Sequence, residues 1–414
     1  MESLNVFLLN RFVGALSSEN GQLSFQYDSA YISNAASAPI SFSMPLRAEP
    51  FDNQITAAFF ENLLPPDIVR KRLGKILHLS RHNVFGFLKA LGGDCAGAIA
   101  LYPPDTSQTN AVAETPELRE LSLDETVQIL TELPKRPLNM GRENGFRISG
   151  TGAQDKLIAC VQDGKVFLPL YGAPSTHIIK PPIPEYPGSV FNELFCMRLA
   201  QMTGLQTPQC EILTFADVPY YCVTRYDRHS ENGKTFRLHQ EDFCQLLSVA
   251  PEKKYEMEGG PSIPVCFKLI REMRLGASGQ LDFIRRIIFN YLIGNGDAHA
   301  KNTSVLYHGK TGTLAPVYDL LSTEIYPMLS HESAMAIGKD CEFSQITRKS
   351  FEQMALDCQI RPGAVLDQID KLVSVTLKHA PSLANDLNAK YPSPVYAEIL
   401  HVIERQSTHL VANA

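Results

Sequence analysis

The chain has 414 residues, of which 44% are hydrophobic and 20% charged, and this composition is that of a globular rather than a disordered protein. At this length we expect two or three domain-sized units with sizeable cores. A formal net charge of −6, without an evident basic stripe, disfavours direct binding to nucleic acid. Nine irregularly spaced cysteines without a Cys-x-x-Cys pair favour intracellular free thiols. No signal peptide or membrane span is visible, so we expect a cytoplasmic protein.

The first hundred residues predict a compact α+β unit. Short alternating or apolar segments between Gly, Asn, Ser and Pro predict strands over residues 5–9, 23–27 and 40–44. Helical spacing of apolar residues predicts helices over 55–64 and 83–91. The polar stretch 103–115 predicts a surface loop or linker. Residues 123–133 predict a short helix with acidic residues in its first turn.

From residue 146 onward the pattern changes. Strands are predicted over 146–149, 157–161, 176–180 and 220–224, and a helix over 190–202. Beyond these the chain reads as mainly helical except around 303–318, and no long period repeats, which argues against a solenoid. This order of elements is that of a two-lobed kinase, although it also fits many other α+β proteins.

The strongest cluster of chemically useful residues surrounds Asp297. An apolar helix expected over 283–293 runs into the turn Gly294-Asn-Gly296, and Asp297 and Asn302 follow at an interval of five residues. A kinase catalytic loop spaces its Asp and Asn in this way: the Asp accepts the proton of the substrate hydroxyl and the Asn binds magnesium. The alternative is a polar loop in which both side chains bond to turn backbone.

Asp319 supplies a second acid. It follows a hairpin expected over 303–314, and a hairpin returns the chain close to Asn302. An Asp and an Asn, with waters and phosphate oxygens, complete a magnesium site, because this ion prefers oxygen ligands. The alternative role for Asp319 is to cap the amino terminus of a following helix.

Lys180 and Glu193 each sit in apolar surroundings. Lys180 ends the strand Thr176-His-Ile-Ile-Lys180, and Glu193 shares a face of the next helix with apolar residues. A charge in such a place needs a partner. A Lys180–Glu193 pair explains both and matches the pair that holds a kinase lysine against nucleotide phosphates. The alternative is a purely structural salt bridge.

The segment Ser149-Gly-Thr-Gly-Ala-Gln-Asp-Lys156 is a Gly-containing turn. Small residues let backbone amides approach phosphate oxygens closely. The Gly-Lys-Ser/Thr ending of a Walker A loop is missing, and a lone turn of this kind is usually only a hairpin. Phosphate loop, Lys, paired Glu and Asp…Asn…Asp nevertheless occur in the order found in kinases, and their conjunction favours a kinase.

At these residues the chain resembles the HipA family of bacterial toxin kinases. The resemblance is carried by Phe146-Arg-Ile-Ser-Gly-Thr-Gly-Ala-Gln-Asp-Lys156, Thr176-His-Ile-Ile-Lys180, Asn192-Glu193, Arg225-Tyr-Asp-Arg228, His239-Gln-Glu-Asp-Phe-Cys-Gln245, Gly296-Asp-Ala-His-Ala-Lys-Asn302 and Tyr318-Asp319. The amino-terminal part is similar to the family's small first domain through Phe59-Phe-Glu-Asn-Leu-Leu-Pro65 and Gly97-Ala-Ile99.

The resemblance implies an α+β, two-lobed protein-kinase-like fold. We expect a small amino-terminal α+β domain over 1–105, a region like a kinase amino-terminal lobe over 106–228, and a mainly helical carboxy-terminal lobe over 229–414. It also implies a serine/threonine kinase that uses ATP and Mg²⁺.

The same resemblance implies roles for individual residues. Asp297 would be the catalytic base, and Asn302 and Asp319 would bind the metal. Nucleotide contacts would come from Thr151, Gly152, Ala153, Gln154, Asp155, Lys156, Lys180, Glu193, Thr224, Arg225, Tyr226, His299, Ala300, Lys301, Asn302, Tyr318 and Asp319. Among these, Thr224–Tyr226 would be the hinge whose backbone meets adenine. Ser149 corresponds to the family's autophosphorylated, self-inactivating serine.

The implied partners are a small helix-turn-helix antitoxin like HipB and a protein substrate such as an aminoacyl-tRNA synthetase, with glutamyl-tRNA synthetase as the first expectation. DNA would be contacted only through the antitoxin, and no membrane is involved. The phosphate loop reads Ser-Gly-Thr-Gly where the familiar version has Ser-Ile-Ala-Gly, so Thr151 is a second candidate phosphoacceptor. The catalytic turn reads Asn-Gly-Asp-Ala-His where Ala-Thr-Asp-Gly-His is expected.

Two other functions remain open from the sequence. One is a small-molecule phosphotransferase of similar architecture. The other is a catalytically silent nucleotide-binding scaffold that acts as a corepressor. Retention of Asp297, Asn302, Asp319 and Lys180 together argues against the silent scaffold.

Overall fold

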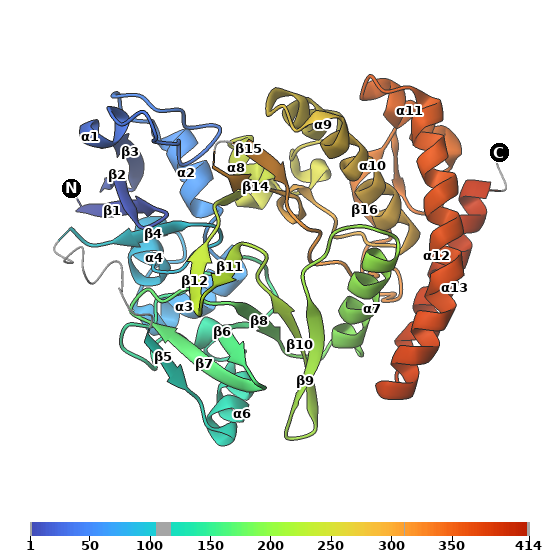
Figure 1. Ribbon diagram of the computed structural model, residues 1–414, viewed down its shortest axis with the longest axis horizontal. Helices are drawn as coiled ribbons and strands as arrows, with labels where there is room; N and C mark the ends of the chain where they lie inside the picture. Colours follow the sequence, from blue (N-terminus) through green and yellow to red (C-terminus); the bar gives the residue numbers. More distant parts are fainter. Residues whose placement is uncertain (1, 105–116, 310, 412–414) are drawn as a thin grey trace. The chain divides into compact units, whose positions relative to one another are not determined.

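A computed structural model describes residues 2–104, 117–309 and 311–411 (Figure 1). The chain divides into two compact units. The first comprises residues 1–181, 213–252 and 305–312, and the second comprises 182–212, 253–304 and 313–414. The linker predicted over 103–115, and with it the domain boundary expected at residue 105, lies almost entirely outside the described residues.

The amino-terminal part of the first unit is an antiparallel sheet with helices. The strand order is β3-β2-β1-β4, with β1 (Glu2–Leu8), β2 (Arg11–Glu19), β3 (Gln22–Tyr27) and β4 (Ile99–Tyr102). Its helices are α1 (Ser29–Ile32), α2 (Asn53–Glu61), α3 (Asp67–Leu77) and α4 (Val84–Leu91). Asp52 and Asn83 cap α2 and α4 by accepting backbone hydrogen bonds.

The strand predicted over 40–44 is wrong. Ser41 and Met44 form a single bridge across a tight turn. The backbone groups on either side bond to a side chain instead: the Tyr27 hydroxyl accepts from the Ile40 amide at 2.8 Å and donates to the Met44 carbonyl at 2.7 Å. An apolar segment whose backbone is satisfied in this way needs no neighbouring strand.

The rest of the first unit is built on a six-stranded sheet. Its order is β5-β7-β6-β8-β10-β9, with β5 (Glu117–Glu120), β6 (Leu157–Gln162), β7 (Lys165–Leu170), β8 (His177–Lys180), β9 (Cys210–Phe215) and β10 (Val218–Thr224). Helix α6 (Leu123–Glu132) begins with a capping box between Ser122 and Glu125. The strand predicted over 146–149 is wrong, because β7 and β8 already occupy both sides of β6. Only Ile148 pairs, in one bridge to Asp94.

Smaller elements complete the first unit and lead into the second. Strands β11 (Arg228–Glu231) and β12 (Lys234–Arg237) form a hairpin, and β13 (Gln240–Asp242), β14 (Ser304–His308) and β15 (Thr311–Leu314) form a three-stranded sheet. Neighbouring β14 and β15 confirm the predicted hairpin. Short helical segments are η1 (Pro137–Asn139), α8 (Phe243–Leu246), η2 (Pro251–Lys253), η3 (Glu256–Glu258) and η4 (Ala300–Asn302).

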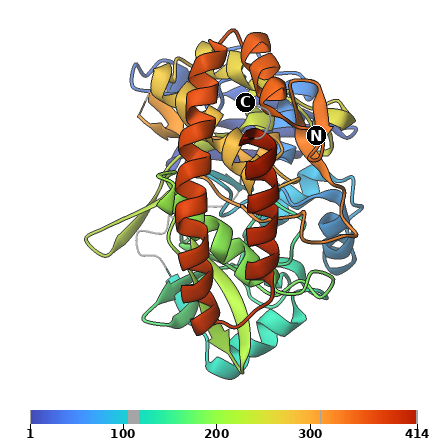
Figure 2. The ribbon, with the colours of Figure 1, turned by 90° about the vertical axis from the view of Figure 1, so that its right-hand side faces the viewer.

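The second unit is mainly helical. The expectation that the chain beyond 224 is helical except around 303–318 missed the strands within 228–242 and 332–342. Its helices are α7 (Ser189–Met202), α9 (Ile263–Glu272), α10 (Gly276–Leu292), α11 (Arg348–Asp357), α12 (Pro362–Lys390) and α13 (Val395–Val411), and its two strands are β16 (Glu332–Ile337) and β17 (Asp340–Glu342). The long helices α12 and α13 lie side by side (Figures 1 and 2). In the part of the chain that the structure describes, no helix is both long and apolar enough to cross a lipid bilayer.

Candidate active site

The turn that carries Asp297 is held by hydrogen bonds from a second loop. Helix α10 ends at Leu292 with Ile293 as its C-cap, and Gly294 follows in the left-handed region with φ of 65°. Its carbonyl accepts from the Thr323 amide at 2.9 Å and from the Thr323 hydroxyl at 3.1 Å, and that hydroxyl accepts from the Gly296 amide at 2.7 Å. A Cβ at Gly294 would lie 2.7 Å from the Glu324 side chain, so both φ and space require glycine.

Backbone hydrogen bonds then fix Asp297 itself. Its amide donates to Asn295 Oδ1 at 3.1 Å, and its carbonyl accepts from the His299 amide and from Asn302 Nδ2, both at 2.8 Å. Asn302 therefore bonds to turn backbone, as the alternative of a purely structural polar loop predicts, and the atom that makes this bond is Nδ2. The Asn302 Oδ1 atom remains an acceptor. The Asp297 carboxylate bonds to a side chain, the Tyr255 hydroxyl.

Asp319 adopts an unusual backbone conformation. Its φ is 58°, in the left-handed region that a non-glycine residue rarely occupies, and such strain is found most often at functional sites. No helix begins after it, because β16, starting at Glu332, is the next element of the described chain. The helix-cap role considered for Asp319 is therefore wrong.

The chain returns to Asn302 at this point, as the hairpin predicted. The Ala315 amide donates to the Ser304 carbonyl at 2.8 Å. The Tyr318 hydroxyl donates to the Lys301 carbonyl at 2.6 Å and lies 2.7 Å from the Ser304 hydroxyl. These contacts set residues 315–319 beside the end of the catalytic turn.

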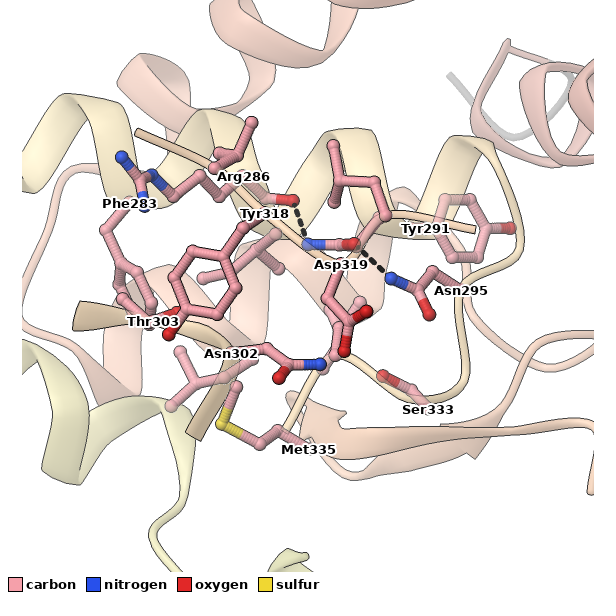
Figure 3. Close-up of a pocket in the computed structure, with 17 residues that line it drawn as sticks. Phe283, Arg286, Tyr291, Asn295, Asn302, Thr303, Tyr318, Asp319, Ser333 and Met335 are labelled. Atoms are coloured by element: carbon pink, nitrogen blue, oxygen red, sulfur yellow. Dashed lines mark hydrogen bonds between the residues drawn. The ribbon is translucent and has the colours of Figure 1, made fainter. Parts of the chain in front are cut away.

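Asn302 and Asp319 line one cavity of about 40 Å³ within the second unit. In Figure 3 the Asp319 carboxylate points towards the Asn302 amide, with Tyr318 beside them. A volume of this size admits more than one water molecule. A carboxylate and an amide oxygen at one small cavity fit a hydrated Mg²⁺, although apolar side chains such as Phe283 and Met335 line the rest of it. Among the described residues, no group of three or more His, Cys, Asp or Glu is arranged to hold a metal, so protein ligands alone would not complete the shell.

His299 is buried beside Asp297. Its Nε2 lies 3.6 Å from Asp297 Oδ1 and 2.8 Å from the Lys254 ammonium. Burial lowers the pKa of His299 to about 4, although Asp297 opposes the shift, so the imidazole is neutral at pH 7 and its Nε2 accepts from Lys254. Sequence reasoning did not find Lys254 or Tyr255, because no local pattern marks the segment before Gly259.

Glu193 lies in α7 and is buried, with 5% of its surface exposed. Its neighbour Asn192 bonds twice to the loop after Asp319: Nδ2 donates to the Ser322 carbonyl at 2.9 Å, and Oδ1 accepts from the Ser322 amide at 2.8 Å. Glu193 belongs to the second unit and Lys180 to the first. The ion pair between them stays a prediction.

The candidate phosphate loop belongs to the first unit. Lys156 is buried, and its ammonium donates to the carbonyls of Thr151 and Gly152. Asp155 accepts two hydrogen bonds from Arg72 of α3, at 2.8 and 3.2 Å. Gly152 and Ala153, at the tip, are exposed. Gln154 donates to the Pro181 carbonyl at 3.2 Å. The loop is therefore held at its base and open at its tip.

Ser149 is buried at the start of this loop. Only 2% of its surface is exposed, and its hydroxyl donates to the Leu63 carbonyl at 2.5 Å. Its amide donates to the Asp94 carbonyl at 3.0 Å. A phosphate on Ser149 requires the loop to leave this conformation.

Lys180 ends β8, and the expected hinge, Thr224–Tyr226, begins at the end of the neighbouring strand β10 in the same unit. Lys180 pairs with Tyr221 across β8 and β10, and its ammonium lies 5.7 Å from the centre of the Tyr221 ring. The Arg225 amide, just after Thr224, donates to the Thr176 carbonyl at 2.8 Å. That amide is occupied, so adenine recognition by this segment would have to use other backbone groups.

The side chain of Arg225 enters a buried ion network that sequence reasoning missed. Asp94 pairs with Arg228 Nη2 at 2.8 Å and with Arg237 Nε at 2.9 Å, and Asp227 pairs with Arg225 at 2.8 Å. Burial raises the pKa of Asp94, but the three arginines outweigh it and hold that pKa far below the ordinary range. The network connects the end of α4 to the strands around Arg225.

Comparisons with known proteins identify what this chain is similar to. The model of the HipA N-terminal domain matches residues 4–102, and that of the HipA-like C-terminal domain matches residues 148–380. The chain is 39% identical to "Putative kinase Y4mE" of Sinorhizobium fredii, over 94% of this chain and 93% of that protein. It is 32% identical to "Serine/threonine-protein kinase toxin HipA" of Shewanella oneidensis, over 74% of this chain and 72% of that protein.

A solved structure gives the same result. A chain of the "Shewanella oneidensis MR-1 Toxin Antitoxin System HipA, HipB and its operator DNA complex" matches with a TM-score of 0.83 at 25% identity, and the match covers 97% of both chains. The match confirms the expected α+β, kinase-like fold class.

Proposed function

The chain belongs to the HipA family, and from this premise we propose that it is an ATP-dependent serine/threonine protein kinase that acts as the toxin of a toxin–antitoxin pair. The observation that carries the proposal is the Asp297 turn, in which backbone hydrogen bonds fix a carboxylate five residues before an amide that shares a cavity with Asp319. A pre-positioned acid beside a set of oxygen ligands suits phosphoryl transfer, where catalysis is mainly positioning and electrostatic stabilisation.

In the proposed reaction Asp297 receives the proton of the acceptor hydroxyl. The bond between the γ-phosphorus of ATP and its bridging oxygen breaks, and a bond forms between that phosphorus and the acceptor oxygen. The products are a phosphoserine or phosphothreonine and ADP. The Tyr255 hydroxyl donates a hydrogen bond to Oδ1 of the Asp297 carboxylate, and the proton of the acceptor hydroxyl would go to Oδ2.

Asn302 and Asp319 would hold the magnesium ion, which offsets the charge of the phosphates when bound. These ligands fit the ion, because Asn302 Nδ2 donates to the Asp297 carbonyl and Asn302 Oδ1 would be the atom that binds the ion. The backbone strain at Asp319 also fits a residue held for function rather than for stability.

Nucleotide binding is assigned to residues of both units. In the first unit, Thr151–Lys156 would contact phosphates through backbone amides, Lys180 would neutralise phosphate charge, and Thr224–Tyr226 would meet adenine. In the second, Glu193 would orient Lys180, and residues 299–301 with Tyr318 would line the phosphate side. The open tip of the loop, with Gly152 and Ala153 exposed, supports its part of this assignment.

We further propose Ser149 as the site of autophosphorylation. The phosphate would add about −1.5 to −2 charges at a position that is now buried and bonded to Leu63. The modified loop would then be unable to return, and ATP binding would stop. Peptide mapping after incubation with ATP and Mg²⁺ should place one phosphate on Ser149; a phosphate found only on Thr151 would refute this assignment.

The partners are proposed by family membership. The similar structure is named as a complex of HipA, HipB and operator DNA, which supports a HipB-like helix-turn-helix antitoxin for this chain. The net charge of −6 supports contact with DNA only through that partner. A translation protein such as glutamyl-tRNA synthetase is the proposed substrate, in the cytoplasm of a bacterium.

One assay separates this proposal from its alternatives. Purified chain is incubated with Mg²⁺ and γ-labelled ATP, in parallel with a bacterial protein extract and with a panel of small alcohols and sugars. Label in one or a few protein bands is the expected result. Label only in small molecules would instead establish a small-molecule phosphotransferase. ATP binding without any transfer would establish a silent scaffold.

A further inference from the structure

Tyr255, in the segment before Gly259, contacts the Asp297 carboxylate in the second unit. The Tyr255 hydroxyl donates a hydrogen bond to Asp297 Oδ1. We propose that Tyr255 is a positioning residue, which holds one oxygen of the Asp297 carboxylate so that the other faces the acceptor hydroxyl. This inference rests on the proposed kinase function and extends it to a residue that no sequence motif marked.

The ring of Tyr255 is fixed by its surroundings. It meets His299 edge to face, with ring centres 5.1 Å apart at an angle of 85°. The adjacent Lys254 fastens the same histidine, because its ammonium lies 2.8 Å from His299 Nε2, and its carbonyl accepts from the Ala300 amide at 3.4 Å. His299 and Ala300, which follow Asp297, are therefore bonded to Lys254, which precedes Tyr255.

The backbone of Tyr255 is anchored as well. Its carbonyl accepts from the amides of Glu258 at 3.1 Å and Gly260 at 2.9 Å. A Cβ at Gly260 would lie 2.6 Å from that carbonyl oxygen, so the close turn requires glycine there. One residue on, the Glu256 carboxylate accepts from the Ala336 amide of β16 at 2.7 Å. The tyrosine thus stands on a segment bonded at both ends.

This anchoring decides between two roles for the hydroxyl. A hydroxyl bonded to a kinase base resembles an acceptor substrate, so Tyr255 would also suit a blocking group that leaves when substrate arrives. A blocking group needs a segment that moves away easily, whereas Tyr255 is held by its ring, its carbonyl and both neighbours. Fixed positioning is the role that this geometry favours.

The test uses the full chain and the phosphotransfer assay described above. Tyr255→Phe keeps the ring and removes the hydroxyl. We expect kcat to fall about ten- to a hundredfold with the KM for ATP within about twofold of wild type, because the lost hydrogen bond acts on the carboxylate and not on the nucleotide. Tyr396→Phe is the matched control. Tyr396 is also buried, on α13, and the substitution removes a hydroxyl that is not bonded to Asp297. It should leave kcat unchanged within about twofold.

A second variant tests the hydroxyl without removing it. Incorporation of 3-fluorotyrosine at position 255 retains shape and donor, so kcat should return to within about threefold of wild type. Three outcomes overturn the proposal: a normal kcat in Tyr255→Phe, a raised kcat in Tyr255→Phe as a blocking group predicts, or failure of 3-fluorotyrosine to restore a lost rate. An inactive wild-type chain would instead refute the proposed function itself, and this inference with it.

Discussion

Removal of the Asp94 charge should strongly destabilise the first unit, although the substitution Asp94→Asn changes the side chain at only one heavy atom. The Asp94 side chain is 1% exposed and accepts from Arg228 Nη2 at 2.8 Å, Arg237 Nε at 2.9 Å and the Ser175 hydroxyl at 2.6 Å. Asp94→Asn keeps the shape and removes the charge. Three buried arginines would then face one remaining aspartate, Asp227, in the network.

The magnitude follows from the burial of these charges. Breaking a buried ion pair by removing one partner costs about 3–5 kcal/mol, because the other charge stays buried without compensation. A loss of this size lowers the melting temperature of a unit of this length by about 6–20 °C. Asp67→Asn in the same unit is the matched control, since its pair with Arg81 is largely exposed and should contribute less than about 1 kcal/mol.

The assay is urea unfolding followed by far-ultraviolet circular dichroism, because the chain has no tryptophan to report by fluorescence. The arginines hold the pKa of Asp94 below its ordinary value, so the stability that its charge contributes is complete above about pH 4 and is lost only in stronger acid. The difference between wild type and Asp94→Asn should therefore be constant from pH 8 to about pH 5. A difference below about 1 kcal/mol at pH 7, equal to that of Asp67→Asn, would show that the buried charge of Asp94 contributes no more than an exposed ion pair.

Two further predictions concern the first unit. Arg72→Met removes both hydrogen bonds to Asp155 and should raise the KM for ATP about three- to tenfold, with little change in kcat, in steady-state kinetics; an unchanged KM would show that this contact does not hold the loop. Burial raises the pKa of Glu241 to about 7, even though the Tyr307 hydroxyl donates to it at 2.5 Å. Stability from the protonated carboxyl is complete below about pH 4.3 and is lost as pH rises through 7, so the free energy of unfolding should fall by up to about 3 kcal/mol over that range. In urea titrations, the free energy of unfolding of Glu241→Gln should not change with pH over the same range. A wild-type free energy of unfolding that is equally independent of pH would show that Glu241 does not titrate in this way.

Local patterns predicted the elements whose stability is local. The helix over 123–133 was predicted with acidic residues in its first turn, and the structure adds a capping box between Ser122 and Glu125 at the same end. The segment 40–44 misled for the opposite reason, because its backbone partner is the hydroxyl of Tyr27, a tertiary contact. The strand predicted over 146–149 failed because the positions beside β6 belong to other strands, which no local pattern reveals.

The same distinction holds for the candidate site. The Asp297–Asn302 interval was readable because a turn of five residues fixes it, and the position of Asp319 followed from a hairpin. The contact between Tyr255 and Asp297 joins residues 42 apart in sequence, and no sequence pattern around Tyr255 predicts it. The network around Asp94 likewise gathers charges from distant segments, so it needs the fold to be seen.

In the proposed reaction, Asp297 is the group that accepts the proton of the acceptor hydroxyl. The decisive measurement compares wild type with Asp297→Asn in the labelled-ATP assay with Mg²⁺, with Asp386→Asn, an exposed position on α12, as the control. We expect Asp386→Asn to transfer phosphate at the wild-type rate and Asp297→Asn to lose at least about a hundredfold in kcat while it unfolds at the wild-type temperature. A folded Asp297→Asn chain that transfers phosphate at the wild-type rate would show that Asp297 is not the catalytic base.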